Sequence, residues 1–112
     1  MVALTEKRDG STSNLVESGL LSGVGQTPWM PLTGLGEHVF TCDIEDLGGA
    51  FGTFVVETRR VRGDDSVVTT RTIFSSSILA DFPQIGRLAG WWEVRLRCSA
   101  YGGGSFNLSV SR

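Results

Sequence analysis

The C-terminal end of the chain carries the feature that most restricts the fold, a strict alternation of apolar and polar residues. The alternation runs through residues 92–100 and 106–110, which are separated by glycines at 102–104. Successive side chains of a β-strand point to opposite faces, so a period of two predicts two strands with one buried face each. We expect these strands to form a hairpin. Its inward side chains would be Trp92, Val94, Leu96, Cys98, Ala100, Phe106, Leu108 and Val110.

A similar but weaker alternation extends back to residue 37. It predicts strands over 37–45, 53–61 and 67–74, joined by glycine-rich or polar turns. Pro83 confines any strand within 78–90 to the edge of a sheet, because proline lacks the backbone donor of a central strand. No segment shows a convincing amphipathic helical period. We therefore expect an all-β protein in which residues 37–112 form a single antiparallel β-sandwich, similar to a jelly roll.

Residues 1–36 show no regular period and are expected to form an extended, irregular N-terminal arm. Residues 18–36 are uncharged, but their five glycines and two prolines make a poor membrane-spanning helix. We expect no membrane contact and no secretion signal. The apolar side chains expected to anchor the arm to a partner are Leu15, Leu20, Leu21 and Trp29.

Charge is distributed unevenly along the 112 residues. Residues 1–50 contain seven acidic and two basic residues, whereas residues 51–112 contain five acidic and eight basic residues. The net charge of −2 argues against a nucleic-acid-binding protein. Nine of the ten basic residues are arginine, which is enriched at protein interfaces, although a compositional bias also produces this pattern. We expect Arg59, Arg60 and Arg62 to form salt bridges with a partner.

Residues with catalytic or ligand-binding chemistry are few. His38 is the single histidine, and its place beside Phe40 on an inward face favours a structural role over that of a general base. No nucleophile elbow, phosphate-binding loop or metal-ligand cluster is present in the sequence. We therefore expect no enzymatic activity, no cofactor and no bound metal. Cys42 and Cys98 occupy apolar positions of two strands and are expected to be buried thiols, with a disulfide as the alternative.

The outward tryptophans leave two interpretations open. The alternation turns Trp92 inward, so Trp91 and Trp29 are the candidates for exposed aromatic faces. Such faces stack on sugar rings in glycan-binding sandwiches, but exposed tryptophan beside arginine is more typical of a protein contact. We expect Trp91 to contact a protein partner.

Two segments together suggest a family resemblance. They are FTCDIEDLGGAFGTFVVETRR, with its GGA turn between early strands, and GWWEVRLRCSAYGGGSFNLSVSR, whose tryptophan-containing strand leads through glycines to a last strand. Residues 37–112 thereby resemble the small β-sandwich proteins of tailed-phage virions. With the N-terminal arm, the chain is similar to the capsid decoration proteins, also called cement or staple proteins, of short-tailed phages of the epsilon-fifteen type.

This resemblance implies a non-enzymatic virion protein that binds the outer surface of a capsid. Its partners would be the major capsid protein and further copies of itself, as a homodimer or homotrimer. It would staple neighbouring capsid subunits on particles assembled in the host cytoplasm. The alternative is a β-sandwich module of a phage tail or baseplate that binds host glycans.

Overall fold

The structure is a computed structural model that describes residues 3–6, 14–34, 36–62, 64 and 66–112. The described residues form ten strands and one short 3-10 helix, η1 (Leu79–Asp81). The strands are β1 (Ala3–Glu6), β2 (Asn14–Leu21), β3 (Gly25–Gln26), β4 (Met30–Leu32), β5 (Glu37–Asp46), β6 (Phe51–Val61), β7 (Val67–Ser76), β8 (Gln84–Ala89), β9 (Trp92–Gly103) and β10 (Phe106–Ser111).

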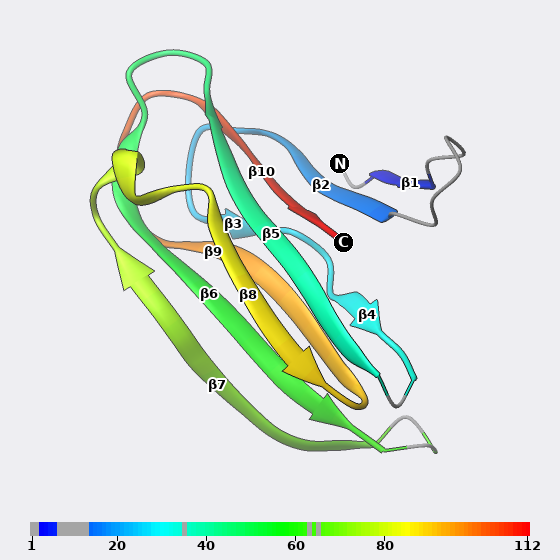
Figure 1. Ribbon diagram of the computed structural model, residues 1–112. Coiled ribbons are helices and arrows are strands. Elements are labelled where there is room, and N and C mark those ends of the chain that lie inside the picture. The colour runs from blue at the N-terminus through cyan, green and yellow to red at the C-terminus, as the bar shows by residue number, and fades with distance from the viewer. Residues whose placement is uncertain (1–2, 7–13, 35, 63, 65) are drawn as a thin grey trace.

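The strands pack as two antiparallel sheets, which confirms the expected all-β sandwich (Figure 1). The first sheet has the order β1-β2-β10-β5-β8, and the second has the order β3-β9-β6-β7. Strand β4 pairs with β9 further along the edge that β3 occupies. The strand after Pro83, β8, is an edge strand, as the missing backbone donor of proline predicts.

The core lies between the sheets and is built around phenylalanines contributed by both. Phe54 of β6 meets Phe106 of β10 edge to face, with ring centroids 5.4 Å apart, and Phe82 packs against Phe54 at 6.2 Å. Fully buried aromatic side chains stabilise such a core through their large apolar area and this ring geometry. Other core residues with no more than 2% exposure are Val16, Met30, Leu32, Phe40, Cys42, Val56, Val94, Leu96, Cys98, Leu108 and Val110.

The two strands with the clearest alternation face each other across the core and are not paired as a hairpin, contrary to expectation. Strand β9 pairs with β6 in one sheet, and β10 pairs with β2 and β5 in the other. The glycine turn therefore carries the chain from sheet to sheet. Alternation predicted the inward face of each strand correctly, because that face depends on burial alone, but it carries no information about which strand lies alongside.

One inward assignment on β9 is wrong. Ala100 is exposed, whereas Val94, Leu96 and Cys98 are buried. Thr53 and Phe54 of β6 lie opposite Ala100 and Cys98, so Ser99 is an extra residue in a β-bulge. A bulge shifts the alternation by one residue, which turns the following side chain outward.

Much of the predicted N-terminal arm is part of the sandwich. Strand β2 pairs with β10, while β3 and β4 pair with β9, so residues 14–32 contribute to both sheets. Met30 and Leu32 are fully buried, and Thr27 is locked to β9 by a hydrogen bond from the Leu96 amide to its hydroxyl at 3.1 Å. Glycines and prolines flank β3 and β4, which at two and three residues are too short to show a period. Residues 1–2, 7–13 and 35 of the predicted arm lie outside the described residues.

Candidate protein-contact surface

The outward face of the β9–β6 pair carries a network of ion pairs. Glu57 of β6 is only 8% exposed and lies between two arginines of β9. The Nε atoms of Arg95 and Arg97 donate to its Oε1 at 2.8 and 3.0 Å, and a second nitrogen of Arg97 donates to Oε2 at 3.2 Å. On the same face, Arg59 donates to Glu93 at 2.6 Å. These arginines are therefore engaged within the protein.

Glu57 is ionised in this setting. Burial by itself would raise the pKa of Glu57, but hydrogen bonds from Arg97 and Arg95, together with their charges, outweigh it and lower the pKa. A carboxylate that receives several charged donors favours its ionised form. The network therefore stabilises the joint between β6 and β9 at neutral pH.

Trp29 covers this network. Its ring lies 4.4 Å from the guanidinium carbon of Arg59 and 4.4 Å from that of Arg95. A cation at this distance over an indole face is attracted by the negative face of the ring. Trp29 and Arg59, both expected to contact a partner, thus contact one another and the sheet.

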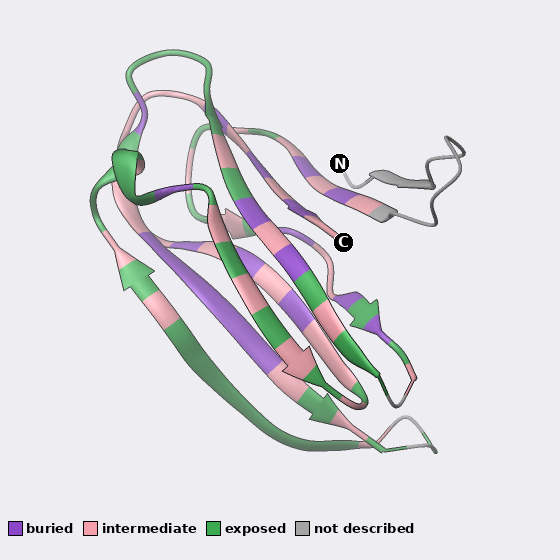
Figure 2. Ribbon diagram, in the orientation of Figure 1, coloured by how far each residue is buried: buried purple, intermediate pink, exposed green. Residues whose placement is uncertain are grey.

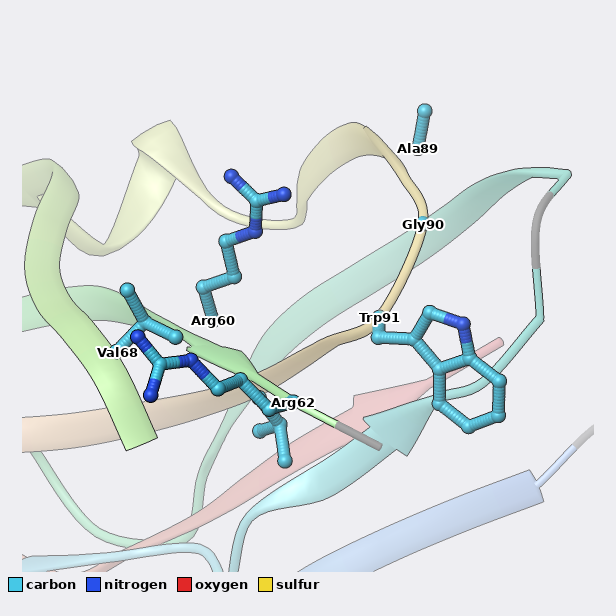
Figure 3. A pocket seen from close by; sticks show the side chains of 7 residues that line it. Arg60, Arg62, Val68, Ala89, Gly90 and Trp91 are labelled. Carbon is cyan, nitrogen blue, oxygen red and sulfur yellow. The ribbon is translucent and has the colours of Figure 1, made fainter. Parts of the chain in front are cut away.

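A second cluster lines a hollow of about 510 Å³ at the end of the sandwich where β6 meets the β8–β9 turn. Arg60, Arg62 and Trp91 line it together with Val61, Val68, Ala89 and Gly90. Figure 3 shows the guanidinium groups of Arg60 and Arg62 on one side and the indole of Trp91 across from them. Trp91 is 44% exposed, and Val68 is 45% exposed. The hollow therefore offers two cations, an aromatic face and an apolar wall to a partner.

Backbone hydrogen bonds hold the turn that positions Trp91. The amide of Gly90 donates to the carbonyl of Gly36 at 3.3 Å, and the amide of Val61 donates to the carbonyl of Trp91 at 3.1 Å. The indole nitrogen of Trp92 donates to the carbonyl of Ala89 at 2.9 Å. Gly90 has a φ of +92°, a region that side-chain-bearing residues seldom adopt. These bonds order the turn and thereby fix the position of Trp91.

The predicted contact residues fall in three separate places. Arg60, Arg62 and Trp91 meet at the hollow, and Trp29 and Arg59 lie on the outward face of the β9–β6 pair. The leucines all lie on β2. Leu15 is half-buried opposite Ser111, Leu20 is 69% exposed, and Leu21 packs against the core. Because Leu21 lies opposite Phe106, the end of β2 is at the far end of the sandwich from the hollow.

Four residues that line the hollow were not predicted as contact residues from the sequence: Val61, Val68, Ala89 and Gly90. Val68 is expected simply as part of a strand, but β-bulges disturb the β6–β7 register between Arg60 and Val61, and Val68 is exposed there. Ala89 and Gly90 end β8 and form the turn. The single sequence signal for the turn is the glycine immediately before the two tryptophans.

Both cysteines are buried free thiols, as predicted. Burial, together with the charge of Asp43, raises the pKa of Cys42 to about 12. Within the described ranges, no three His, Cys, Asp or Glu side chains lie close enough together to hold a metal ion. The same ranges contain no helix with the length and apolar character needed to cross a membrane.

No family model matches the chain, and no curated protein matches it by sequence. Among solved structures, it is similar to the Glycosylation Associate Protein (Gap123) complex from Streptococcus agalactiae, with 17% identity and a TM-score of 0.45. The match covers 98% of this chain and 22% of that chain, so this protein spans about a fifth of the length of its neighbour. A likeness at this level carries no argument about function.

Proposed function

We propose that this chain is a non-enzymatic virion protein that binds the outer surface of a phage capsid and staples neighbouring major capsid subunits. The observation that carries the protein-binding part is the hollow, in which exposed Trp91 lies across from Arg60 and Arg62. Tryptophan and arginine dominate the residues that contribute most to protein contacts. The capsid as partner, on particles assembled in the host cytoplasm, follows from the resemblance of residues 37–112 to the decoration proteins.

A staple needs two separated contact surfaces, and the end opposite the hollow offers apolar side chains for a second contact. They are Leu20 at 69% exposure, Val24 at 65%, Leu47 at 50% and Phe51 at 58%. The molecule measures 40 × 33 × 24 Å, so contacts at its two ends fall on different parts of a partner surface. We propose that each end contacts a different capsid subunit, because two linked contacts bind far more tightly than either one alone.

Association with further copies is part of the proposal and is supported by the edge strand β7. Figure 2 shows β7 exposed along most of its length. Val67, Val68 and Ile73 of this strand are each more than 40% exposed, and β7 pairs with β6 alone among the described strands. A long exposed edge rich in β-branched residues is a template for pairing with another chain. A homodimer or homotrimer formed through this edge would cover it.

The direct test is sedimentation of the purified protein with DNA-free capsid shells of the phage whose virions contain it. We expect co-sedimentation that saturates at a copy number comparable to that of the major capsid protein. Trp91→Ala should weaken binding by about thirtyfold if Trp91 is a central contact residue. Arg87→Gln is the matched surface control, since Arg87 is exposed and pairs with Glu37 outside the hollow, and it should bind normally. Protein left in the supernatant at excess shells would overturn the proposal.

Copy number separates the proposal from a glycan-binding tail module. Quantitative mass spectrometry of whole virions would find only a few copies of a tail or baseplate protein. A low count, together with glycan binding that is lost in Trp91→Ala, would replace the capsid proposal with the tail one.

A further inference from the structure

We propose that the hollow lined by Arg60, Arg62 and Trp91 binds a carboxylate side chain from an acidic, partly apolar segment of the protein partner. This inference rests on the proposed function, because it names the chemistry that the same surface recognises. It states what the partner presents: an aspartate or glutamate next to an apolar residue.

The first argument is the pairing of the arginines. Arg59, Arg87, Arg95 and Arg97 each form a salt bridge with a glutamate of the chain. Arg71 lies over the ring of Trp92, 5.3 Å from its centroid. Arg60 and Arg62 form no salt bridge with any other described residue, and these two are the arginines that line the hollow. Of the described arginines without a salt bridge, Arg71 lies over Trp92 and Arg112 ends the chain, whereas Arg60 and Arg62 share one concave surface.

The second argument is geometry. Arg60 lies near the end of β6 and Arg62 directly follows the strand, and both line the same hollow, with their guanidinium groups visible in Figure 3. Planar guanidinium groups match a carboxylate through paired N–H donors. Trp91 and Val68 supply apolar surface within the same hollow. A carboxylate would therefore contact the two arginines while an apolar neighbour of that carboxylate contacts Trp91 and Val68.

The charge around the hollow favours an acidic protein segment over a nucleic acid. A nucleic-acid strand needs a continuous basic track, whereas this chain is net negative and leaves two arginines for the site. Asp64 lies in the adjoining β6–β7 turn, where hydrogen bonds from Ser66 lower the pKa of its carboxyl, so the turn adds a negative charge. A nucleic-acid strand would need a basic track that continues beyond the two arginines, and the adjoining turn supplies a negative charge instead.

The test uses acetylated hexaglutamate as the probe and nuclear magnetic resonance of the arginine Nε–H and tryptophan indole N–H groups of the full chain. Hexaglutamine controls for the charge of the probe, and hexathymidylate controls for a polyphosphate. We expect hexaglutamate to shift the signals of Arg60, Arg62 and Trp91 while leaving those of Arg59 and Arg95 in place. Binding should weaken about fivefold or more in Arg60→Gln and in Arg62→Gln. Arg87→Gln is the matched control and should keep the affinity.

The proposal is overturned if hexaglutamate shifts none of the three signals, or if hexaglutamine binds equally well. It is also overturned if hexathymidylate binds more tightly than hexaglutamate at the same ionic strength, which would identify a phosphate site. If Arg87→Gln lost as much affinity for hexaglutamate as Arg60→Gln and Arg62→Gln, the binding would reflect the overall positive charge of the surface, and the proposal would be overturned. The circular dichroism spectrum of each variant, compared with that of the wild type, verifies that the sandwich is folded.

The results that would overturn the carboxylate site differ from those that would overturn the capsid proposal. If the protein binds shells but Arg60→Gln and Arg62→Gln bind them equally well, the carboxylate site is wrong and the capsid proposal stands. If hexaglutamate binds in the hollow but shells do not bind the protein, the capsid proposal is wrong and the carboxylate site stands.

Discussion

Replacing Glu57 by glutamine tests whether the ion-pair network joins β6 to β9. The substitution preserves shape and one acceptor oxygen but removes the charge that Arg95 and Arg97 share. Hydrogen bonds to charged groups contribute about 1.5–3 kcal/mol when buried. The two arginine side chains are 24% and 33% exposed, so water screens part of this, and glutamine retains a neutral bond. We expect the free energy of unfolding to fall by about 2 kcal/mol.

The assay is urea unfolding at pH 7, followed by tryptophan fluorescence. A loss of about 2 kcal/mol would lower the midpoint by about 1.5 M urea for a domain of this size. Glu37→Gln is the matched control, because its pair with Arg87 has side chains 59% and 66% exposed. Exposed pairs contribute little, so this control should lose at most about 0.5 kcal/mol. If the two variants were equally stable, the reasoning about burial of Glu57 would be refuted.

The pH dependence of the same difference provides a second check. The pKa of Glu57 is lowered in the folded protein, so its contribution is complete above the unfolded value, about 4.3, and is lost as the pH falls through the folded value. The stability gap between wild type and Glu57→Gln should be constant from pH 8 to about pH 5 and narrow below about pH 4.3. A gap that stays unchanged in acid would mean that the charge of Glu57 does not cause the effect.

Two further predictions concern the turn glycine and the thiols. In Gly104→Ala, the new Cβ would overlap the backbone of Gly49, at a φ of +77°, so stability measured by thermal unfolding should fall by about 2 kcal/mol or more. Gly23→Ala, with no atom within 4 Å of its Cβ, should change it by less than about 0.5 kcal/mol, and equal effects would contradict the packing argument. For the thiols, burial raises the pKa of Cys42 and of Cys98, so neither should react with a disulfide reagent at pH 8 until the protein unfolds. Rapid modification of the native protein would show that the thiols are accessible.

The alternation of apolar and polar residues predicted strands correctly wherever one face of the strand is buried. It located β5, β6, β7, β9 and β10, and it assigned Val94, Leu96 and Leu108 to the core, because burial imposes a period of two on a strand whatever its neighbours are. It failed at Ala100, where a β-bulge shifts the register. A bulge depends on the partner strand, so a single strand carries no signal for it.

Residues 25–26 and 30–32 also form strands that the alternation of apolar and polar residues did not predict. Met30 and Leu32 are fully buried, but β3 and β4 have only two and three residues. A strand of that length is stabilised by pairing with β9 and not by any pattern of its own. Deleting residues 1–30 would therefore remove β2, β3 and the core side chain Met30. We expect this deletion to unfold the sandwich, so it could not be used to test whether residues 1–30 contact a partner.

Three of the residues that line the hollow, Arg60, Arg62 and Trp91, were among the expected contact residues, but the sequence did not indicate that they lie together. The abundance of arginine and the outward tryptophan pointed to Arg59, Arg60, Arg62 and Trp91, and the sequence alone does not distinguish the role of one of these arginines from that of the others. In the structure, Arg59 is paired with Glu93, while Arg60 and Arg62 line the hollow with Trp91. Adjacent residues of a strand point to opposite faces, but which face meets glutamates and which meets the β8–β9 turn depends on the strands alongside.

By itself, the sequence determined that this chain is an all-β sandwich and which side chains of its longer strands point inward, because both follow from a local period and the cost of exposing apolar area. Only the tertiary structure decided that β9 and β10 lie in opposite sheets, that residues 14–32 contribute to both sheets, and that Arg60 and Arg62 line one hollow with Trp91. These outcomes depend on contacts between residues distant in the chain. Local patterning limits such contacts but does not select among them.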